Sequence, residues 1–338
     1  MPEIPSVSVL IPTYNYARFL PTAIESVLSQ DFTDFELIVS DDASSDGSAE
    51  VIRRYAERDR RIRVHIHESN VGMVGNWNWS LRQARGTYVK FLFADDCLAF
   101  RHSLGRLVSH LEDNPGAVLA ASARLVIDEE SRPVGIWNHL QTPGLLQGRD
   151  VVARCLWNDG NLIGEPSAVL FRRAPAGRGF DPQLKQLVDL EFWFHLLLTG
   201  DLVFDPEPLC SFRVHSGQQT VQNRQSHVGP EESLRITSRY LEFLCSGAGN
   251  HLTTFQRMRI LHRCLHYSRK RVARAPNVVS AEAELDARLP RGWRMLCWMA
   301  HRSSKPFENL VRFVRRDLRT REPTPVPAAL YAWRPPRE

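Results

Sequence analysis

Apolar runs and amphipathic segments alternate along the first part of the chain. Three short runs rich in β-branched residues predict strands, at residues 6–11, 35–39 and 62–67. Three segments with apolar residues spaced three and four apart predict helices, at residues 19–29, 48–58 and 76–84. Strands and helices that alternate with short connections predict a mainly parallel sheet with helices on both faces, which is an α/β fold.

The next predicted strand, within residues 87–97, ends on two adjacent acids, Asp95 and Asp96. Two buried carboxylates this close repel each other, and a proton or a cation relieves the repulsion. Oxygen ligands with few Cys or His residues nearby favour Mg²⁺ or Mn²⁺ over zinc. Taken alone, the run is explained equally well by two solvated acids in a loop or by a helix N-cap.

A second acid pair, Asp41 and Asp42, follows the predicted strand 35–39. The carboxyl ends of parallel strands share one edge of a sheet, and ligands bind along that edge. The two acid pairs should therefore converge on one crevice, which favours a functional site over solvated loops. The chain has no GxGxxG motif after its first strand and no GxxxxGK[ST] motif, so a dinucleotide-dependent dehydrogenase and a P-loop NTPase are unsupported.

The amino-acid composition limits the class of protein and the cellular compartment that we expect. The chain has 338 residues, of which 43% are hydrophobic and 24% charged, as expected for a globular enzyme with one or two domains. No apolar run reaches about 20 residues, so we expect no transmembrane helix, and the first residues do not resemble a secretory signal. Six cysteines without CxxC spacing argue against a zinc site and predict a cytoplasmic protein.

Charge is distributed unevenly along the chain. Residues 230–338 carry 21 Lys and Arg against 10 Asp and Glu, whereas the whole chain has a net charge of +5. Within this basic part, residues 307–318 repeat apolar residues at helical spacing, with arginines on the other faces. Such a helix is typical of peripheral proteins on an anionic membrane, here its inner face, although a helix packed on the catalytic domain has the same pattern. The segment lacks a nucleic-acid-binding module, so we expect no nucleic-acid partner.

Four motifs follow one another along the chain: Val7–Asn15, Ser26–Gln30, Phe35–Gly47 and Asn70–Asn78. Together they resemble glycosyltransferase family 2, densely up to Asp96 and more sparsely up to residue 219. The resemblance implies a GT-A fold, in which a mixed, mainly parallel sheet has helices on both faces. It also implies transfer of a sugar from a nucleoside diphosphate donor, usually with inversion at the anomeric carbon and with a divalent metal, Mn²⁺ or Mg²⁺.

The resemblance assigns residues to the nucleotide-sugar site and to the metal. Nucleotide-sugar contacts fall on Pro12, Thr13, Tyr14, Asn15, Asp41, Asp42, Asp95 and Gly164. The metal ligands fall on Asp95, Asp96 and His215. The family's Asp-x-Asp motif falls on Phe93–Asp95, so Phe93 stands where the first acid is most common. A cation at this point would stabilise the negative charge that develops on the departing diphosphate.

An inverting transfer requires a carboxylate that takes the proton from the acceptor hydroxyl. Residues 187–194 predict a helix with two acids near its start, Asp189 and Glu191. In the resemblance, Asp189 aligns with the family's general base, four residues before Trp193, and Glu191 is the second candidate. Favourable charge at a helix N-terminus would explain the same acids without catalysis.

We therefore predict three segments. Residues 1–225 form a GT-A catalytic domain, with a nucleotide-binding half (1–96) and an acceptor and catalytic half (97–225). Residues 226–322 form a basic helical segment, and the proline-rich residues 323–338 form a loose tail.

The predicted activity is transfer from a nucleotide sugar, with UDP as the first choice, to a saccharide of a cell-surface polysaccharide, either free or lipid-linked. One alternative is a catalytically weak or inactive nucleotide-sugar-binding protein. Another is a sugar-nucleotide pyrophosphorylase, but that class has a glycine- and arginine-rich loop after its first strand, where this chain has residues 12–15.

Overall fold

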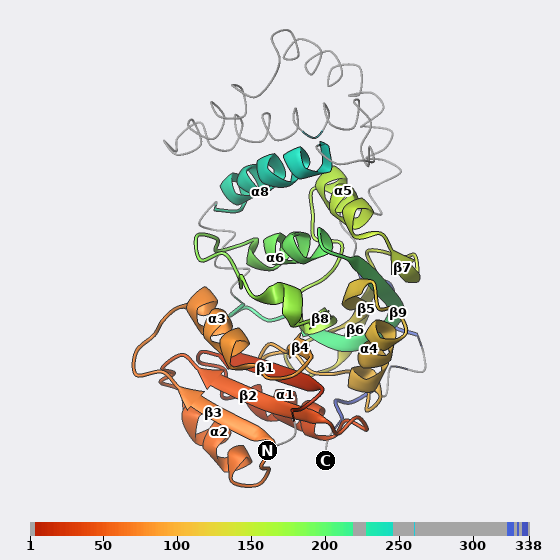
Figure 1. Ribbon diagram of the computed structural model, residues 1–338. Helices are drawn as coiled ribbons and strands as arrows, with labels where there is room; N and C mark the ends of the chain where they lie inside the picture. The colour runs from red at the N-terminus through yellow and green to blue at the C-terminus, as the bar shows by residue number, and fades with distance from the viewer. Residues whose placement is uncertain are drawn as a thin grey trace.

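The computed structural model describes residues 4–218, 228–245, 260, 323–327, 330 and 333–336. These residues contain a nine-stranded sheet with the order β3-β2-β1-β4-β8-β5-β9-β7, and β6 pairs with β5 outside this path (Figure 1). The strands are β1 Val7–Thr13, β2 Phe35–Asp41, β3 Ile62–Ile66, β4 Tyr88–Phe91, β5 Ala117–Ile127, β6 Pro133–Trp137, β7 Gly144–Leu146, β8 Val169–Arg172 and β9 Asp201–Arg213.

The sheet is mixed, as predicted. Strands β1 to β4 pair in parallel, β8 runs antiparallel to both β4 and β5, and β5 pairs in parallel with β9. The three strands predicted first coincide with β1, β2 and β3 within two residues at each end. Strand β4 is shorter than the predicted run because it ends at Phe91, which leaves the acid pair in the turn that follows.

Helices cover both faces of this sheet, which confirms the α/β prediction (Figure 1). They are α1 Leu20–Leu28, α2 Ser48–Ala56, α3 Met73–Gln83, α4 Ser103–Glu112, α5 Gly148–Asn158, α6 Val188–Leu197 and α8 Val228–Cys245, with short 3₁₀ turns at Pro166–Ala168 and Ala174–Ala176. Helices α1, α2 and α4 enclose one apolar core with the sheet, and α3, α5, α6 and α8 enclose another.

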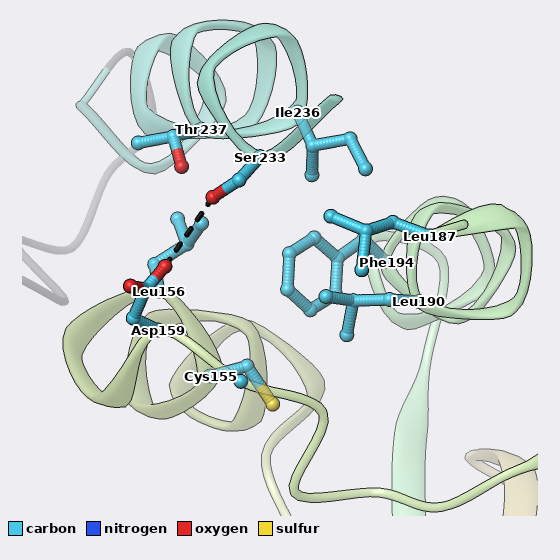
Figure 2. Close-up of a pocket in the computed structure, with 10 residues that line it drawn as sticks. Cys155, Leu156, Asp159, Leu187, Leu190, Phe194, Ser233, Ile236 and Thr237 are labelled. Atoms are coloured by element: carbon cyan, nitrogen blue, oxygen red, sulfur yellow. Dashed lines mark hydrogen bonds between the residues drawn. The ribbon is translucent and has the colours of Figure 1, made fainter. Parts of the chain in front are cut away.

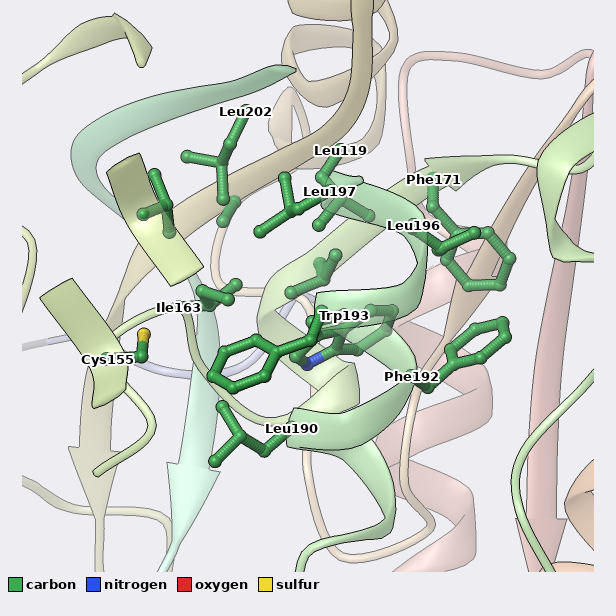
Figure 3. Close-up of a cluster of buried hydrophobic side chains, with 14 of the residues drawn as sticks. Leu119, Cys155, Ile163, Phe171, Leu190, Phe192, Trp193, Leu196, Leu197 and Leu202 are labelled. Atoms are coloured by element: carbon green, nitrogen blue, oxygen red, sulfur yellow. The ribbon is translucent and has the colours of Figure 1, made fainter. Parts of the chain in front are cut away.

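Helix α6 lies in the middle of the second core (Figure 3). Its residues Phe192, Trp193 and Phe194 are all fully buried, although the sequence suggested an amphipathic helix. A helix that is apolar all round must be covered on all sides, and here the sheet and α8 provide the cover. Helix α8 therefore belongs to the body of the catalytic domain, where the sequence predicted the start of a separate basic segment.

The described part of residues 323–338 is not a loose tail. Thr324 pairs with Ile136 on strand β6, and Trp333 is only 8% exposed and donates its indole N–H to the carbonyl of Ala99 over 2.7 Å. Trp333 completes a small apolar cluster with Leu125 and residues of the turn after the acid pair. Proline-rich composition predicted disorder, but one buried tryptophan with a satisfied N–H is enough to anchor the segment.

The predicted membrane-binding helix at residues 307–318 lies outside the described residues. Within the part of the chain that the structure describes, no helix is both long and apolar enough to cross a bilayer.

Candidate active site

The ends of strands β1 and β2 form the first part of the site. Asp41 is fully buried and accepts hydrogen bonds from the backbone N–H and the hydroxyl of Ser44, over 3.0 and 2.5 Å. The carboxylate of Asp42 accepts the N–H of Val71 over 2.7 Å. The hydroxyl of Thr13 is buried and has no hydrogen-bond partner among the described residues. This edge of the sheet thus holds two fixed carboxylates and one buried hydroxyl that is free to bind a ligand.

The loop after β1 carries the remaining residues predicted for the nucleotide. Pro12 is buried within β1, whereas Tyr14 is 48% exposed. The side-chain oxygen of Asn15 accepts a hydrogen bond from the backbone N–H of Ser45. The backbone N–H of Asn15 donates to the hydroxyl of Ser44 over 2.8 Å. Asn15 has a positive φ of 58°, a left-handed backbone conformation that costs free energy and is concentrated at functional sites. The two loops are therefore fixed to each other beside an exposed aromatic ring.

The turn after β4 holds the second acid pair. The Nε2 of His215 lies 3.1 Å from Asp95 Oδ2, and the backbone N–H of Arg213 donates to Asp96 Oδ1 over 2.9 Å. The guanidinium Nε of Arg213 donates to the carbonyl of Asp95 over 2.7 Å. The rings of Tyr16 and Phe19 pack against His215. The three predicted metal ligands therefore lie together, and Arg213 is the residue that holds the turn.

Asp96 is the most unusual acid in this turn. It is 2% exposed, and burial raises its pKa well above the usual range, with a further contribution from the charge of Asp95. The hydroxyl of Ser167 partly offsets this shift, yet Oδ2 has no well-formed hydrogen bond from any residue that the structure describes. A buried carboxylate oxygen without a partner is costly, and a cation would satisfy it. The same acids, after burial, raise the pKa of Tyr16.

Phe93 takes part in an aromatic cluster instead of the acid site. Its ring stacks on Trp77 at 4.9 Å, and Trp77 contacts Phe180 at 5.2 Å. Trp77 is 8% exposed and belongs to the main core. Phe93, which stands where the resemblance has its first acid, therefore supports apolar packing in this chain.

A buried lysine lies beneath the acid pair. Lys90 on β4 is 0% exposed, and its ammonium donates to the carbonyl of Ser167, with that of Pro166 3.5 Å away. Burial lowers the pKa of Lys90 to about 8, although Cys210 and Asp96 act in the opposite direction. The hydroxyl of Ser167 in turn accepts the N–H of Phe93 over 3.0 Å. Lys90 was not among the residues predicted for the site. Its position as a lone lysine inside an apolar strand is the feature of the sequence that could have indicated it.

The loop that begins at Gly164 connects this turn to helix α6. The carbonyl of Gly164 accepts the indole N–H of Trp193 and the amide of Asn161, each over 3.0 Å. Gly164 has a φ of +129°, and a side chain there would lie 3.1 Å from the guanidinium of Arg124. Glycine is therefore required by both the backbone conformation and the space. The amide of Asn161 also donates to Asp189, so the loop and the predicted base share one support.

Asp189 and Glu191 differ in their surroundings although they are two residues apart. Asp189 accepts hydrogen bonds from Asn161 and from the N–H of Leu190, and burial, followed by the charge of Glu165, raises its pKa to about 7. Glu191 is fully buried and accepts hydrogen bonds from Arg178, Arg239 and Tyr240. Burial alone would raise the pKa of Glu191, but Arg178 and Tyr240 more than offset it and lower the pKa.

Helix α8 fixes the start of α6. The carboxylate of Glu232, which is 4% exposed, accepts the backbone N–H groups of Lys185, Gln186 and Leu187 over 2.6 to 2.9 Å. Backbone N–H groups at the start of a helix need partners, and an acid there also interacts well with the helix dipole. Glu232 therefore sets the position from which Asp189 projects. Local sequence patterns do not indicate this contact because the partners are about 45 residues apart.

A pocket lies between α5, α6 and α8, on another part of the domain (Figure 2). It is lined mostly by apolar side chains from these three helices, and the Ser233 hydroxyl donates to Asp159 at its edge over 3.3 Å. None of the predicted site residues lines this pocket, so we assign the site to the strand ends and not to the pocket.

The structure thus gathers the acid pair after β4, His215, the Gly164 loop and Asp189 around one crevice. The charge of Glu165, which follows Gly164 in that loop, raises the pKa of both Asp96 and Asp189. Among the described residues, no group of three or more His, Cys, Asp or Glu side chains is arranged to hold a metal ion alone. A cation at Asp96 would therefore need further ligands from a substrate or from water.

Comparison with known proteins identifies a family. The family model for glycosyl transferase family 2 matches residues 8–178. A putative teichuronic acid biosynthesis glycosyltransferase, TuaG of Bacillus subtilis, is 39% identical over 58% of this chain and 73% of its own length. An uncharacterized glycosyltransferase of the same organism, EpsJ, is 40% identical, but over only 33% of this chain and 32% of its own length.

Solved structures share the fold at low sequence identity. TarS 1–349 of S. aureus, in complex with UDP-GlcNAc, superposes with a TM-score of 0.66 and 18% identity, over 93% of this chain and 91% of that one. The mannosyltransferase PcManGT of Pyrobaculum calidifontis, in complex with GDP-Man and Mn²⁺, superposes with a TM-score of 0.56 and 19% identity, over 91% and 84%. The fold is therefore GT-A, as the sequence predicted.

Proposed function

Because the chain belongs to glycosyltransferase family 2, we propose that it is an inverting, metal-dependent glycosyltransferase that acts on a nucleotide sugar. The observation that carries this proposal is the placement of Asp189. Its carboxylate has no cationic partner among the described residues, and its raised pKa of about 7 suits a base that works near neutral pH. It lies across the Gly164 loop from the acid pair, where a donor and an acceptor could meet.

The donor would lie along the ends of β1, β2 and β4. We expect Asp42 and the buried hydroxyl of Thr13 to bind the base and the ribose, with the exposed ring of Tyr14 beside them. Support for a nucleotide sugar comes from the neighbours, since TarS was solved with UDP-GlcNAc and PcManGT with GDP-Man. UDP remains our first choice of nucleotide.

A divalent cation fits the acid pair. Asp96 has an unpartnered buried oxygen that could bind the ion, and Asp95 and His215 lie beside it. These three side chains are not arranged to hold an ion by themselves, so substrate or water oxygens would complete the set of ligands. Mg²⁺ and Mn²⁺ are commonly bound by one or two carboxylates together with substrate phosphates, which agrees with the absence of a three-residue cluster among the described residues. When bound, the ion would stabilise the charge of the departing nucleoside diphosphate.

In the proposed reaction, Asp189 takes the proton of an acceptor hydroxyl as the hydroxyl oxygen attacks the anomeric carbon. The bond from that carbon to the diphosphate oxygen breaks, and the diphosphate leaves from the opposite face, which inverts the configuration. Asn161 and the N–H of Leu190 orient the carboxylate for this step. Glu191 is a poor second candidate because its oxygens are already bound by two arginines and a tyrosine.

We propose that the acceptor is a growing saccharide of a cell-surface polysaccharide, either free or lipid-linked. The relative TuaG, which is named for teichuronic acid biosynthesis, supports this class of acceptor. Location in the cytoplasm or at the inner face of the membrane stays a prediction, since the predicted membrane-binding helix at residues 307–318 lies outside the described residues. Co-sedimentation of the full chain with anionic and neutral liposomes would test it.

The test of the proposed function is calorimetric titration of the purified protein with UDP, GDP, dTDP and CDP, each with Mn²⁺ and with EDTA. We expect one nucleoside diphosphate to bind, and to bind only with the metal. Binding followed by no turnover of any nucleotide sugar would favour the alternative, an inactive nucleotide-sugar-binding protein. The replacement of the first acid by Phe93 is the observation behind that alternative.

A further inference from the structure

The imidazole ring of His215 is held in one orientation beside the acid pair. Its side chain is 8% exposed, and its Nε2 lies 3.1 Å from Oδ2 of Asp95. The ring of Phe19 packs against it with the centroids 5.1 Å apart, and the ring of Tyr16 meets it edge to face at 5.8 Å. Ring contacts at these distances are favourable and depend on orientation. The same face of the imidazole therefore stays turned towards Asp95.

The other ring nitrogen of His215 accepts a hydrogen bond from the chain itself. The backbone N–H of Gly217 donates to Nδ1 over 3.2 Å. A ring nitrogen that accepts a hydrogen bond carries no proton, and an imidazolium, which has N–H groups at both nitrogens, could not accept this bond. The hydrogen-bond network thus assigns the neutral tautomer with its proton on Nε2. The contact with Asp95 is therefore a hydrogen bond from Nε2–H to a carboxylate oxygen.

A metal ligand needs the opposite arrangement. A histidine that binds an ion does so through an unprotonated nitrogen, and its other nitrogen normally donates an N–H to a carbonyl, a carboxylate or water. In His215 the nitrogen that faces the acid pair carries the proton, and the other nitrogen faces a donor. Moving the proton to Nδ1 would set it against the N–H of Gly217. The family resemblance assigned His215 to the metal, and the hydrogen bonds of the ring disagree with that assignment.

We propose that His215 is a positioning residue, which orients the carboxylate of Asp95 by donating to Oδ2 and does not itself bind the metal ion. The proposal rests on the proposed function, in which a divalent cation binds at the acid pair. With Oδ2 held by His215, Asp95 would meet the ion through Oδ1. Carboxylate oxygens, phosphate oxygens and water are the ligands that suit Mg²⁺ and Mn²⁺, so the set of ligands needs no imidazole.

The direct test is pulsed electron paramagnetic resonance of Mn²⁺ bound to the full chain together with UDP. A nitrogen that is bound directly to Mn²⁺ couples to its electron spin, and labelling histidine with ¹⁵N identifies such a nitrogen as imidazole. We expect no directly bound histidine nitrogen in the wild-type chain and the same spectrum in His215→Gln. A histidine coupling in the wild type that disappears in His215→Gln would overturn the proposal.

Titration of Mn²⁺ in the presence of UDP gives a second readout. Glutamine can place an N–H close to the position of Nε2–H, so we expect His215→Gln to keep the affinity for Mn²⁺ within about threefold. His215→Leu has no donor and should bind Mn²⁺ about 10- to 100-fold more weakly, as for the loss of a partner that orients a ligand. His102→Gln changes a half-exposed histidine before α4 and should match the wild type. Equal losses in His215→Gln and His215→Leu, with both folded, would contradict the role as a donor.

The tautomer of His215 can be determined without metal, in the wild-type chain. With ¹⁵N-labelled histidine, the nuclear magnetic resonance shifts of the ring nitrogens should show the proton on Nε2, and either variant assigns the signals by their loss. A proton on Nδ1 would overturn the role given to His215 while leaving the proposed function intact. If the wild-type chain binds none of the four nucleoside diphosphates with Mn²⁺, the proposed function itself fails, and the metal site fails with it.

Discussion

The strand-end crevice and the interface between α6 and α8 both bury carboxylates, but they treat them in opposite ways. In the crevice, Asp96 and Asp189 have no ion pair within the described residues, and their pKa values are raised. At the interface, Glu191 is bound by Arg178, Arg239 and Tyr240, and its pKa is lowered. A paired buried acid maintains packing, whereas an unpaired one reduces stability and indicates that a ligand or a proton completes the site.

The sharpest test of this comparison is Asp189→Asn. The amide cannot take a proton, so we expect transfer to fall by about 10²- to 10⁴-fold, as for the loss of a general base. Binding of the nucleoside diphosphate should be unchanged because, in the proposed reaction, Asp189 contacts the acceptor and not the nucleotide. Initial rates and calorimetry on one preparation would measure both. Wild-type rates in this variant would contradict its role as the base.

Glu191→Gln should lower the stability of the fold and leave the chemistry of the transfer unchanged. Arg178 and Arg239, whose side chains are 36% and 47% exposed, lose their charged partner, so we expect the free energy of unfolding to fall by about 1–3 kcal/mol, as for lost hydrogen bonds to a charged group. Well below the melting temperature, the pH profile of turnover should keep its shape. Urea unfolding followed by circular dichroism would measure the stability. A folded variant of unchanged stability but without activity would move the base to Glu191.

Asp96→Asn probes the other unpaired acid. We expect metal-dependent binding of the nucleoside diphosphate to weaken on the order of 100-fold or more, since a direct ligand is lost. Without metal, the melting temperature should stay equal or rise, because the variant no longer buries a charge. Titrations with Mn²⁺ and with EDTA, together with thermal melts, would separate these effects. A marked loss of stability would mean that Asp96 is structural.

The pH dependence of stability gives the smallest expected effect. The pKa of Asp189 is raised to about 7 in the folded state from its ordinary value of 3.8, so the folded state binds an extra proton between these two pH values. Its carboxylate therefore destabilises the wild-type chain increasingly as the pH rises through this window. We expect the melting temperature of Asp189→Asn relative to wild type to be higher at pH 8 than at pH 5. A constant difference would show that the pKa of Asp189 is not raised in the folded state.

Local pattern predicted much of this molecule. The alternating runs gave the parallel half of the sheet, and the acids at the ends of β2 and β4 pointed to the correct edge, since both features depend on neighbours in the chain. The partners of Glu191 could not be predicted, because Arg239 lies 48 residues away and on another helix. The same holds for the ion pair between Arg124 and Glu165, which joins strand β5 to the loop before β8. Such contacts depend on how elements pack, and spacing along the chain does not encode them.

The contact between Trp333 and Ala99 has a consequence for how the protein is made. Its partners are 234 residues apart, and contacts over such separations form slowly because a long loop must close first. During synthesis, the turn that carries Asp95 and Asp96 leaves the ribosome long before Trp333, which packs on the residues that follow the acid pair. Until Trp333 has been synthesised and packs, the apolar cluster beside the acid pair is incomplete and Leu125 is partly exposed. In that interval the nascent chain exposes an apolar surface, and a chaperone or an early ligand could shorten the wait.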